Sequence, residues 1–244
     1  MKKSNRPKAF QVFVKPVGAR CNLRCGYCYY LDPGNRRPQR IPDDLLEAYI
    51  IQHIEACAEP VISFSWHGGE PTLFGMEGFR RILPLQKKHA PPDRPVVNGI
   101  QTNGLLLDDS WCRFLAREGF GVGLSLDGPG PFHDAHRRAA DGEATHGRVL
   151  AAYHRLKDHG VPTECLCVVH AGNVRHPLEV YNFFLNLDVP YLTFLPLVEK
   201  TVDGRASHHS VPARAWGDFL CTIFDQWRDN DIGRIKIQIF EEAM

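Results

Sequence analysis

Short apolar runs rich in β-branched residues recur along the chain, and longer segments with helical periodicity separate them. Short runs bounded by turn residues predict strands, whereas apolar residues that return every three or four positions predict helices. The six strands are expected at Phe10–Val14, Val61–Trp66, Val96–Thr102, Phe120–Leu126, Glu164–Val169 and Tyr191–Leu195. The five helices are expected at Pro42–Ala58, Met76–His89, Asp109–Glu118, Thr145–His159 and Pro177–Leu187. Asp43 or Asp44 is expected to cap the first helix, because a carboxylate can accept from its free backbone N–H groups.

This alternation predicts right-handed βαβ units and therefore an α/β fold with a parallel sheet. Ligands of such sheets bind at the carboxyl ends of the strands. The last forty residues break the alternation, since Thr201–Val211 is polar and Pro212–Asp229 has the pattern of an amphipathic helix. Ile235–Phe240 alternates like a half-buried strand, although the start of a helix also fits.

The composition is that of a globular protein. The 244 residues are 43% hydrophobic, enough for a sizeable core in one large domain or two small ones. No run of about 18 apolar residues is present, and the basic N-terminus lacks the apolar stretch of a secretory signal. We therefore expect a soluble, cytoplasmic protein with no membrane partner.

The net charge of +1 conceals an uneven distribution, because residues 1–40 hold ten Lys and Arg and the single acid Asp32. Such a basic segment can bind nucleic acid, face solvent or dock an acidic protein. No aromatic-rich RNA-binding motif accompanies it, so we do not expect a nucleic-acid partner.

The strongest chemical signal is the spacing Cys21-x3-Cys25-x2-Cys28, directly after the first predicted strand. Four cysteines are the rule for a [4Fe–4S] cluster, so three would leave one iron open to a small molecule. The alternatives are a zinc site or three unrelated cysteines. Zinc would need a fourth ligand close by, and the loop offers none.

A second signal follows the second predicted strand, at His67-Gly68-Gly69-Glu70. Two glycines allow the backbone to approach a ligand closely, and the carboxylate beside them can accept from an ammonium group. An ordinary turn is the alternative.

The cysteine loop resembles that of the radical S-adenosylmethionine (SAM) enzymes. The resemblance implies a partial (β/α)6 TIM-like barrel that is open on one side. It also implies two cofactors, a [4Fe–4S] cluster on Cys21, Cys25 and Cys28 and SAM on the open iron. One electron from the cluster would split SAM into methionine and a 5′-deoxyadenosyl radical, which abstracts a hydrogen atom from the substrate.

The same resemblance implies a SAM site. Gly68, Gly69 and Glu70 match the motif that holds the SAM amino group, and His67 stands where some members place glutamine toward the ribose. Further matches place Tyr27 by the adenine, Ser125 against SAM, Arg148 on the SAM carboxylate and Leu195 on the adenine. Simpler alternatives remain open for three of these residues: a packing aromatic for Tyr27, a solvated helix arginine for Arg148 and a core leucine for Leu195.

Longer stretches resemble the anaerobic sulfatase-maturating enzymes, a branch with a C-terminal SPASM domain. These stretches are Lys15–Leu23, Cys28–Leu31, Ser65–Leu73, Phe194–Glu199 and Phe224–Phe240. The implied reaction oxidises the cysteine or serine of a sulfatase Cys/Ser-x-Pro-x-Arg segment to Cα-formylglycine. The basic segment would dock an acidic electron donor, flavodoxin or ferredoxin, and charge reversal at Arg36 and Arg37 should then slow flavodoxin-driven turnover alone.

The SPASM domain of that branch carries two further clusters and an aspartate base, and no cysteine follows Cys221 here. We therefore expect a radical SAM core at residues 1–200 and an extension at 201–244 that leads toward a missing SPASM domain. On this expectation the chain is truncated, cleaves SAM without completing formylglycine formation, and has no assignable catalytic base. Glu241 and Glu242 fit a solvated helix start better than a substitute base. Another SPASM-type maturase and a non-catalytic iron–sulfur fragment are the competing interpretations.

Overall fold

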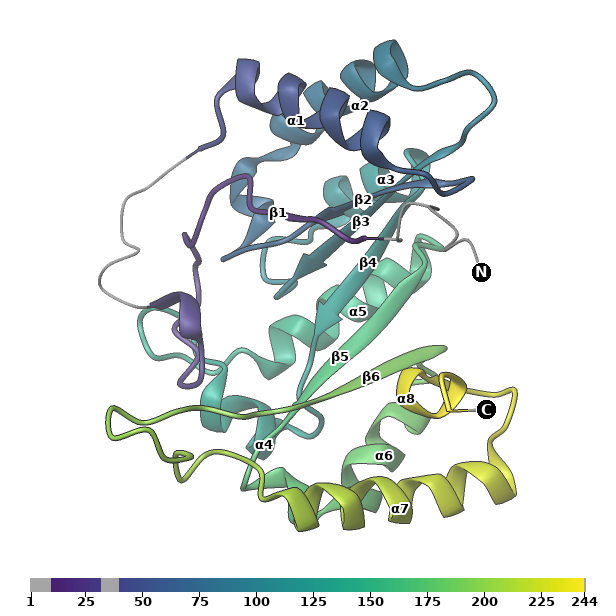
Figure 1. Cartoon of the computed structure of the whole chain (residues 1–244). Coiled ribbons are helices and arrows are strands. Elements are labelled where there is room, and N and C mark those ends of the chain that lie inside the picture. Colours follow the sequence, from purple (N-terminus) through teal and green to yellow (C-terminus); the bar gives the residue numbers. More distant parts are fainter. Residues whose placement is uncertain (1–9, 32–39, 244) are drawn as a thin grey trace, which may run out of the picture.

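The computed structural model describes residues 10–31 and 40–243, and its centre is one parallel sheet (Figure 1). The strand order follows the chain from β1 to β7, and β1 and β7 do not pair within the described ranges. The strands are β1 (Phe13–Val14), β2 (Ile62–Trp66), β3 (Val96–Thr102), β4 (Phe120–Ser125), β5 (Thr163–Val169), β6 (Tyr191–Pro196) and β7 (Lys236–Ile237). The predicted α/β fold, a partial barrel open on one side, is confirmed.

Most of the helices lie on the outer face of the sheet (Figure 1), but the last, Gln238–Glu241, lines the cavity on the concave face. The helices are α1 (Asp43–Ala56), α2 (Met76–His89), α3 (Asp109–Arg117), α4 (Gly130–His136), α5 (His146–Asp158), α6 (Pro177–Asn186), α7 (Ala213–Asn230) and α8 (Gln238–Glu241), with 3-10 turns η1 (Tyr29–Leu31), η3 (Pro71–Phe74) and η4 (Asn173–Arg175). Every predicted helix is present, but the seven-residue α4 was not predicted. The predicted cap of α1 is wrong. Pro42 occupies the cap position, and Asp43 and Asp44 lie in the first turn, where they still oppose the positive end of the helix dipole.

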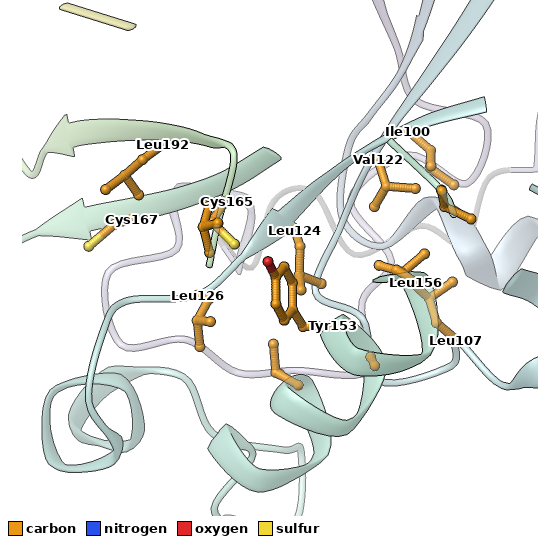
Figure 2. Packing of buried hydrophobic residues seen from close by; sticks show 14 of the residues in the cluster. Ile100, Leu107, Val122, Leu124, Leu126, Tyr153, Leu156, Cys165, Cys167 and Leu192 are labelled. Atoms are coloured by element: carbon orange, nitrogen blue, oxygen red, sulfur yellow. The ribbon is translucent and has the colours of Figure 1, made fainter. Parts of the chain in front are cut away.

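Alternate residues of β2 to β5 face the helices and form the core, whereas three consecutive residues of β6 are buried. Cys165 and Cys167 lie two apart on β5, both fully buried, and they pack near Leu124 and Leu192 (Figure 2). The intervening residues of β5 are only partly buried and face the concave side of the sheet. One face of the sheet therefore packs against helices, and the other face borders a cavity.

The residues beyond 200 continue the same sheet. β7 pairs with β6, and the indole of Trp227 in α7 donates to the carbonyl of Ile235 at 2.8 Å. The ambiguous segment Ile235–Phe240 is thus a short strand followed directly by α8, so both of its interpretations hold in part. The division at residue 200 stays a prediction. None of the helices in the described ranges has the length and apolarity needed to cross a membrane.

Candidate functional site

The loop of residues 18–28, hereafter the cysteine loop, is held between two other segments by backbone hydrogen bonds. On one side the N–H groups of Gly69 and Glu70 donate to the carbonyls of Gly18 and Arg20, at 3.0 and 2.8 Å. On the other side Gly26 donates to the carbonyl of His136 at 2.9 Å. The two sequence motifs, which are forty residues apart, therefore lie side by side at the carboxyl end of the sheet.

This close approach explains the two glycines. Gly68 has a φ of +111°, a conformation that L side chains rarely adopt. A Cβ atom on Gly69 would lie 2.2 Å from the carbonyl oxygen of Arg20, inside the backbone that leads to Cys21. A side chain at Gly69 would thus push the cysteine loop away, so the glycine pair has a role beyond making a turn.

Glu70 is completely buried and joins three segments. Its Oε1 accepts from the backbone N–H of Thr72 at 3.0 Å and from the Thr102 hydroxyl at 2.7 Å, while Oε2 accepts from the N–H of Asn103 at 2.8 Å. Burial raises the pKa of this carboxyl, although the hydrogen bonds oppose that shift. Asn103, to which the sequence assigned no role in the site, continues the network by donating from Nδ2 to Asn22 Oδ1 at 2.8 Å.

The three cysteines of the loop are free thiols, with Cys25 the most buried. Burial raises the pKa of Cys21 to about 12 and that of Cys25 to about 11, so a metal would have to displace their protons on binding. Within the described ranges no three His, Cys, Asp or Glu side chains converge on a point where one metal ion could bind. A zinc site requires such convergence, with ligands about 2.0–2.3 Å from the ion. A cubane binds one thiolate per iron, so the donor set fits a [4Fe–4S] cluster better than zinc.

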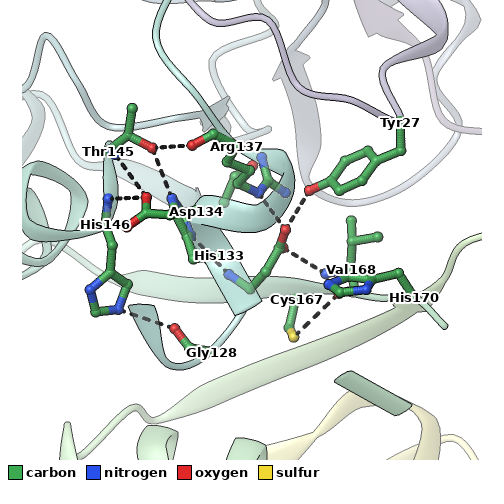
Figure 3. A network of polar contacts seen from close by, with 12 residues as sticks. Tyr27, Gly128, His133, Asp134, Arg137, Thr145, His146, Cys167, Val168 and His170 are labelled. Atoms are coloured by element: carbon green, nitrogen blue, oxygen red, sulfur yellow. Dashed lines mark hydrogen bonds and ion pairs between the residues drawn. The ribbon is translucent and has the colours of Figure 1, made fainter. Parts of the chain in front are cut away.

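Asp127, fully buried after β4, organises the other side of the cysteine loop (Figure 3). The Tyr27 hydroxyl donates to this carboxylate, and Arg137 Nε donates to the same oxygen at 2.8 Å. The N–H of Val168 donates to the second oxygen at 2.9 Å. Burial alone would raise the pKa of Asp127, but the Arg137 charge and these hydrogen bonds outweigh it and hold the pKa below its usual value.

Arg137, rather than Arg148, is the arginine that the structure brings to the cysteine loop. Its guanidinium lies 5.5 Å from the centre of the Tyr27 ring, and its terminal nitrogens bond to no described residue, so they can receive an anion. Arg148 is exposed on α5 and makes no hydrogen bond or ion pair with the described part of the cysteine loop. Sequence reasoning missed Arg137 because the stretch between β4 and α5 has neither helical nor strand periodicity.

The concave face of the sheet borders a cavity of about 960 Å³. His67 and Leu195 line it, and Leu195 is 41% exposed, so it is no core leucine. Ser125 adjoins the cavity through Gln101, whose Nε2 donates to the Ser125 hydroxyl at 3.0 Å. Nδ1 of His67 is buried with no partner in the described ranges, and burial lowers the pKa of this imidazole. The predicted SAM-site residues other than Arg148 thus lie around one end of the sheet.

Comparison with known proteins agrees with this geometry. The family model of the radical SAM superfamily matches residues 16–184. This chain belongs to the radical SAM superfamily. It is 40% identical to the serine-type anaerobic sulfatase-maturating enzyme of Bacteroides thetaiotaomicron, over 97% of this chain and 62% of that protein. It is 32% identical to the cysteine-type enzyme of Clostridium perfringens, over 94% of this chain and 64% of that protein.

A solved structure of a radical SAM protein is also similar. The structure of native anSMEcpe with bound AdoMet and Cp18Cys peptide matches with a TM-score of 0.84 and 33% identity, over 95% of this chain and 64% of that one. This radical SAM chain thus spans a little over 60% of the length of the curated relatives it matches.

Proposed function

We propose that this chain binds a [4Fe–4S] cluster and SAM and generates the radical with which a sulfatase-maturating enzyme oxidises a cysteine or serine to Cα-formylglycine. The observation that carries the proposal is the backbone pairing of Gly69 and Glu70 with the start of the cysteine loop. Through this pairing the glycine motif lies directly beside Cys21. The sulfatase-maturating relatives, which match nearly the whole chain, support the substrate class.

Each residue of the site has a part in this proposal. The thiolates of Cys21, Cys25 and Cys28 hold the cluster. A cluster held there, together with SAM, would supply the radical chemistry that removes a hydrogen atom from the substrate. Glu70 orients the glycine motif toward the SAM amino group, and Arg137 offers its free terminal nitrogens to the SAM carboxylate, a role that we transfer from Arg148.

The remaining contacts to SAM are apolar or weakly polar. Tyr27, fixed by its hydrogen bond to Asp127, and Leu195, exposed in the cavity, provide surfaces for the adenine. His67 faces the ribose and Ser125 adds a hydroxyl beside Gln101. The cavity on the concave face then takes the Cys/Ser-x-Pro-x-Arg segment of a sulfatase.

An acidic electron donor, flavodoxin or ferredoxin, would reach the cluster from outside. Arg36 and Arg37 lie outside the described residues, but Arg24 and Arg138 are exposed on the outer side of the cysteine loop. The N–H of Arg24 donates to the carbonyl of Arg138 at 2.9 Å, beside the antiparallel bridge between Leu23 and Ala139. The two arginines therefore lie next to each other. Neither forms an ion pair with a described acidic residue, and the free positive charge suits an acidic partner.

Anaerobic assay of the reconstituted chain tests the proposal. With SAM and dithionite we expect 5′-deoxyadenosine and methionine, and Cys25→Ala should abolish both products. With a sulfatase peptide present, hydrazide capture detects any aldehyde. A protein that binds the cluster but releases no 5′-deoxyadenosine would be a non-catalytic iron–sulfur module, whereas a peptide cross-link instead of an aldehyde would indicate another kind of maturase.

A further inference from the structure

The cavity on the concave face has one wall almost without side chains. Gly99 of β3 and Gly121 of β4 are directly paired, and both line the cavity. A Cβ atom on Gly121 would meet nothing within 4 Å, and one on Gly99 would meet only the carbonyl oxygen of Phe64 at 4.0 Å. Neither glycine has a positive φ. Since neither the backbone nor the packing requires glycine at these two positions, they keep space open for a ligand.

The strand next to β4 carries a carboxylate on the same concave face, since Glu164 of β5 pairs with Gly123 of β4. Glu164 of β5 lines the cavity and accepts one hydrogen bond, from the Thr193 hydroxyl to its Oε1 at 2.6 Å. Glu164 forms no ion pair with a described cation. Lys236, which lines the same cavity, lies over the Tyr191 ring at 5.4 Å. A partly buried carboxylate can bind a ligand that brings a positive charge and several N–H donors.

We propose that the half of the cavity nearest the amino ends of the strands is a substrate subsite, in which a peptide lies over Gly99 and Gly121 and Glu164 binds a cationic side chain of that peptide. The subsite rests on the proposed function, because its occupant is the substrate of that reaction. It adds a residue that decides which peptides bind. Glu164 is then a specificity residue and takes no part in the chemistry.

The spacing agrees with the substrate motif. Glu164 and Val168 are four residues apart on β5, a distance of about 13 Å at the usual rise of a strand. The N–H of Val168 donates to Asp127, and the same carboxylate binds Arg137 and Tyr27. Val168 therefore lies at the same height along the sheet as these two side chains. In an extended Cys/Ser-x-Pro-x-Arg segment the arginine also follows the reacting residue by about 13 Å. A peptide whose reacting residue lies at the level of Asp127 therefore places its arginine beside Glu164.

Peptide binding to the full chain, reconstituted with cluster and SAM and followed by fluorescence anisotropy, tests the subsite. The probes are a labelled sulfatase peptide with arginine in the motif and the same peptide with citrulline, which has nearly the same shape but no charge. We expect citrulline to weaken binding about tenfold in the unaltered protein. In Glu164→Gln the two peptides should bind equally, at the weaker level. Glu164→Lys should prefer a peptide with glutamate in place of arginine.

Two matched variants separate the charge from the local structure. Thr193→Val removes the hydrogen bond to Glu164 but leaves its charge, so the arginine preference should remain. Gly121→Val fills the open wall and should abolish peptide binding while SAM affinity and 5′-deoxyadenosine release stay unchanged.

Three results overturn the subsite. Equal binding of the arginine and citrulline peptides to the unaltered protein, which requires no variant to fold, rejects Glu164 as the anchor and leaves the proposed radical chemistry standing. Unchanged peptide affinity in Gly121→Val rejects the cavity as the peptide site. Binding of neither peptide, with 5′-deoxyadenosine still released, rejects both the subsite and the sulfatase substrate.

Discussion

The hydroxyl of Tyr27, inside the cysteine loop, donates a hydrogen bond to the carboxylate of Asp127, which comes 100 positions later in the chain (Figure 3). Because Arg137 binds the same carboxylate oxygen, one buried aspartate fixes both an aromatic ring and a guanidinium beside the three thiols. The positions of Tyr27 and Arg137 therefore depend on a carboxylate that is itself fully buried.

Replacing that charge should destabilise the fold. Asp127→Asn leaves the Arg137 guanidinium buried without a counter-charge, so we expect the free energy of unfolding to fall by about 3 kcal/mol in urea denaturation. Asp203→Asn is the control, because that carboxylate pairs with Arg205 on the surface, where solvent screens the pair, and its loss should change stability little. Equal losses in the two variants would contradict a buried pair.

SAM affinity distinguishes the two candidate arginines. Arg137→Lys keeps the charge but loses the forked geometry that grips a carboxylate, so the dissociation constant for SAM should rise about tenfold. Arg148→Gln should leave it unchanged, since that side chain is exposed on α5. Calorimetry on the reconstituted protein measures both. A larger effect at Arg148 would restore the assignment made from sequence.

The glycine motif can be tested by adding a single methyl group. Gly69→Ala places a Cβ atom against the Arg20 carbonyl, which should displace the cysteine loop and lower the iron bound per chain after reconstitution. Gly217→Ala is the matched control, because its Cβ atom meets nothing within 4 Å in the middle of α7. The control should keep its iron and gain about 0.5–1 kcal/mol of stability. Full iron content in Gly69→Ala would mean that the loop tolerates the displacement.

Stability should also depend on pH through His133. Burial lowers the pKa of this imidazole to about 4, and its Nδ1 accepts from the N–H of Asp127 at 3.2 Å. The imidazole takes up its proton at about pH 6.5 in the unfolded chain but only near pH 4 in the folded chain. The free energy of unfolding should therefore decrease by about 3 kcal/mol as the pH is lowered from 6.5 to 4. His133→Gln should reduce this dependence in urea titrations but not remove it, because burial also lowers the pKa of His170 to about 4. His154→Gln, at an exposed position, should leave it intact. An unchanged slope in His133→Gln would contradict the assignment to His133.

Electron supply tests the exposed arginines of the cysteine loop. Arg138→Glu should slow flavodoxin-driven release of 5′-deoxyadenosine about tenfold at low salt, because charge complementarity raises association rates. Dithionite-driven release should not change. Arg113→Glu makes the same substitution on α3, away from the loop, and should have no effect with either reductant. Loss of activity with both reductants in Arg138→Glu would indicate a damaged loop instead of a docking surface.

The elements that the sequence predicted well are those with strong periodicity. β3 and α2 have the predicted bounds, because each has a full alternation or a full apolar stripe that covers the core. α4 was not predicted, because a helix of seven residues has too few turns to show an apolar stripe in the sequence. Arg137, which directly follows α4, was missed for the same reason.

The cysteines and glycines of the site were predictable because they stand at fixed spacings in single loops. Contacts between loops were not. Asn103 joins Glu70 to the cysteine loop, and Asp127 joins Tyr27 to Arg137, through hydrogen bonds that span 10 to 100 positions. Such pairs follow only from the register of neighbouring strands, which the sequence pattern does not define to the residue.

The alternation of buried and cavity-facing residues along β3, β4 and β5 has a consequence for how this chain can change over evolutionary time. Substitution at Gly99, Gly121 or Glu164 alters the surface that meets a substrate, while the neighbouring positions on the same strands keep the helices in place. A lineage can thus exchange one target protein for another, residue by residue, without rebuilding the scaffold that handles SAM.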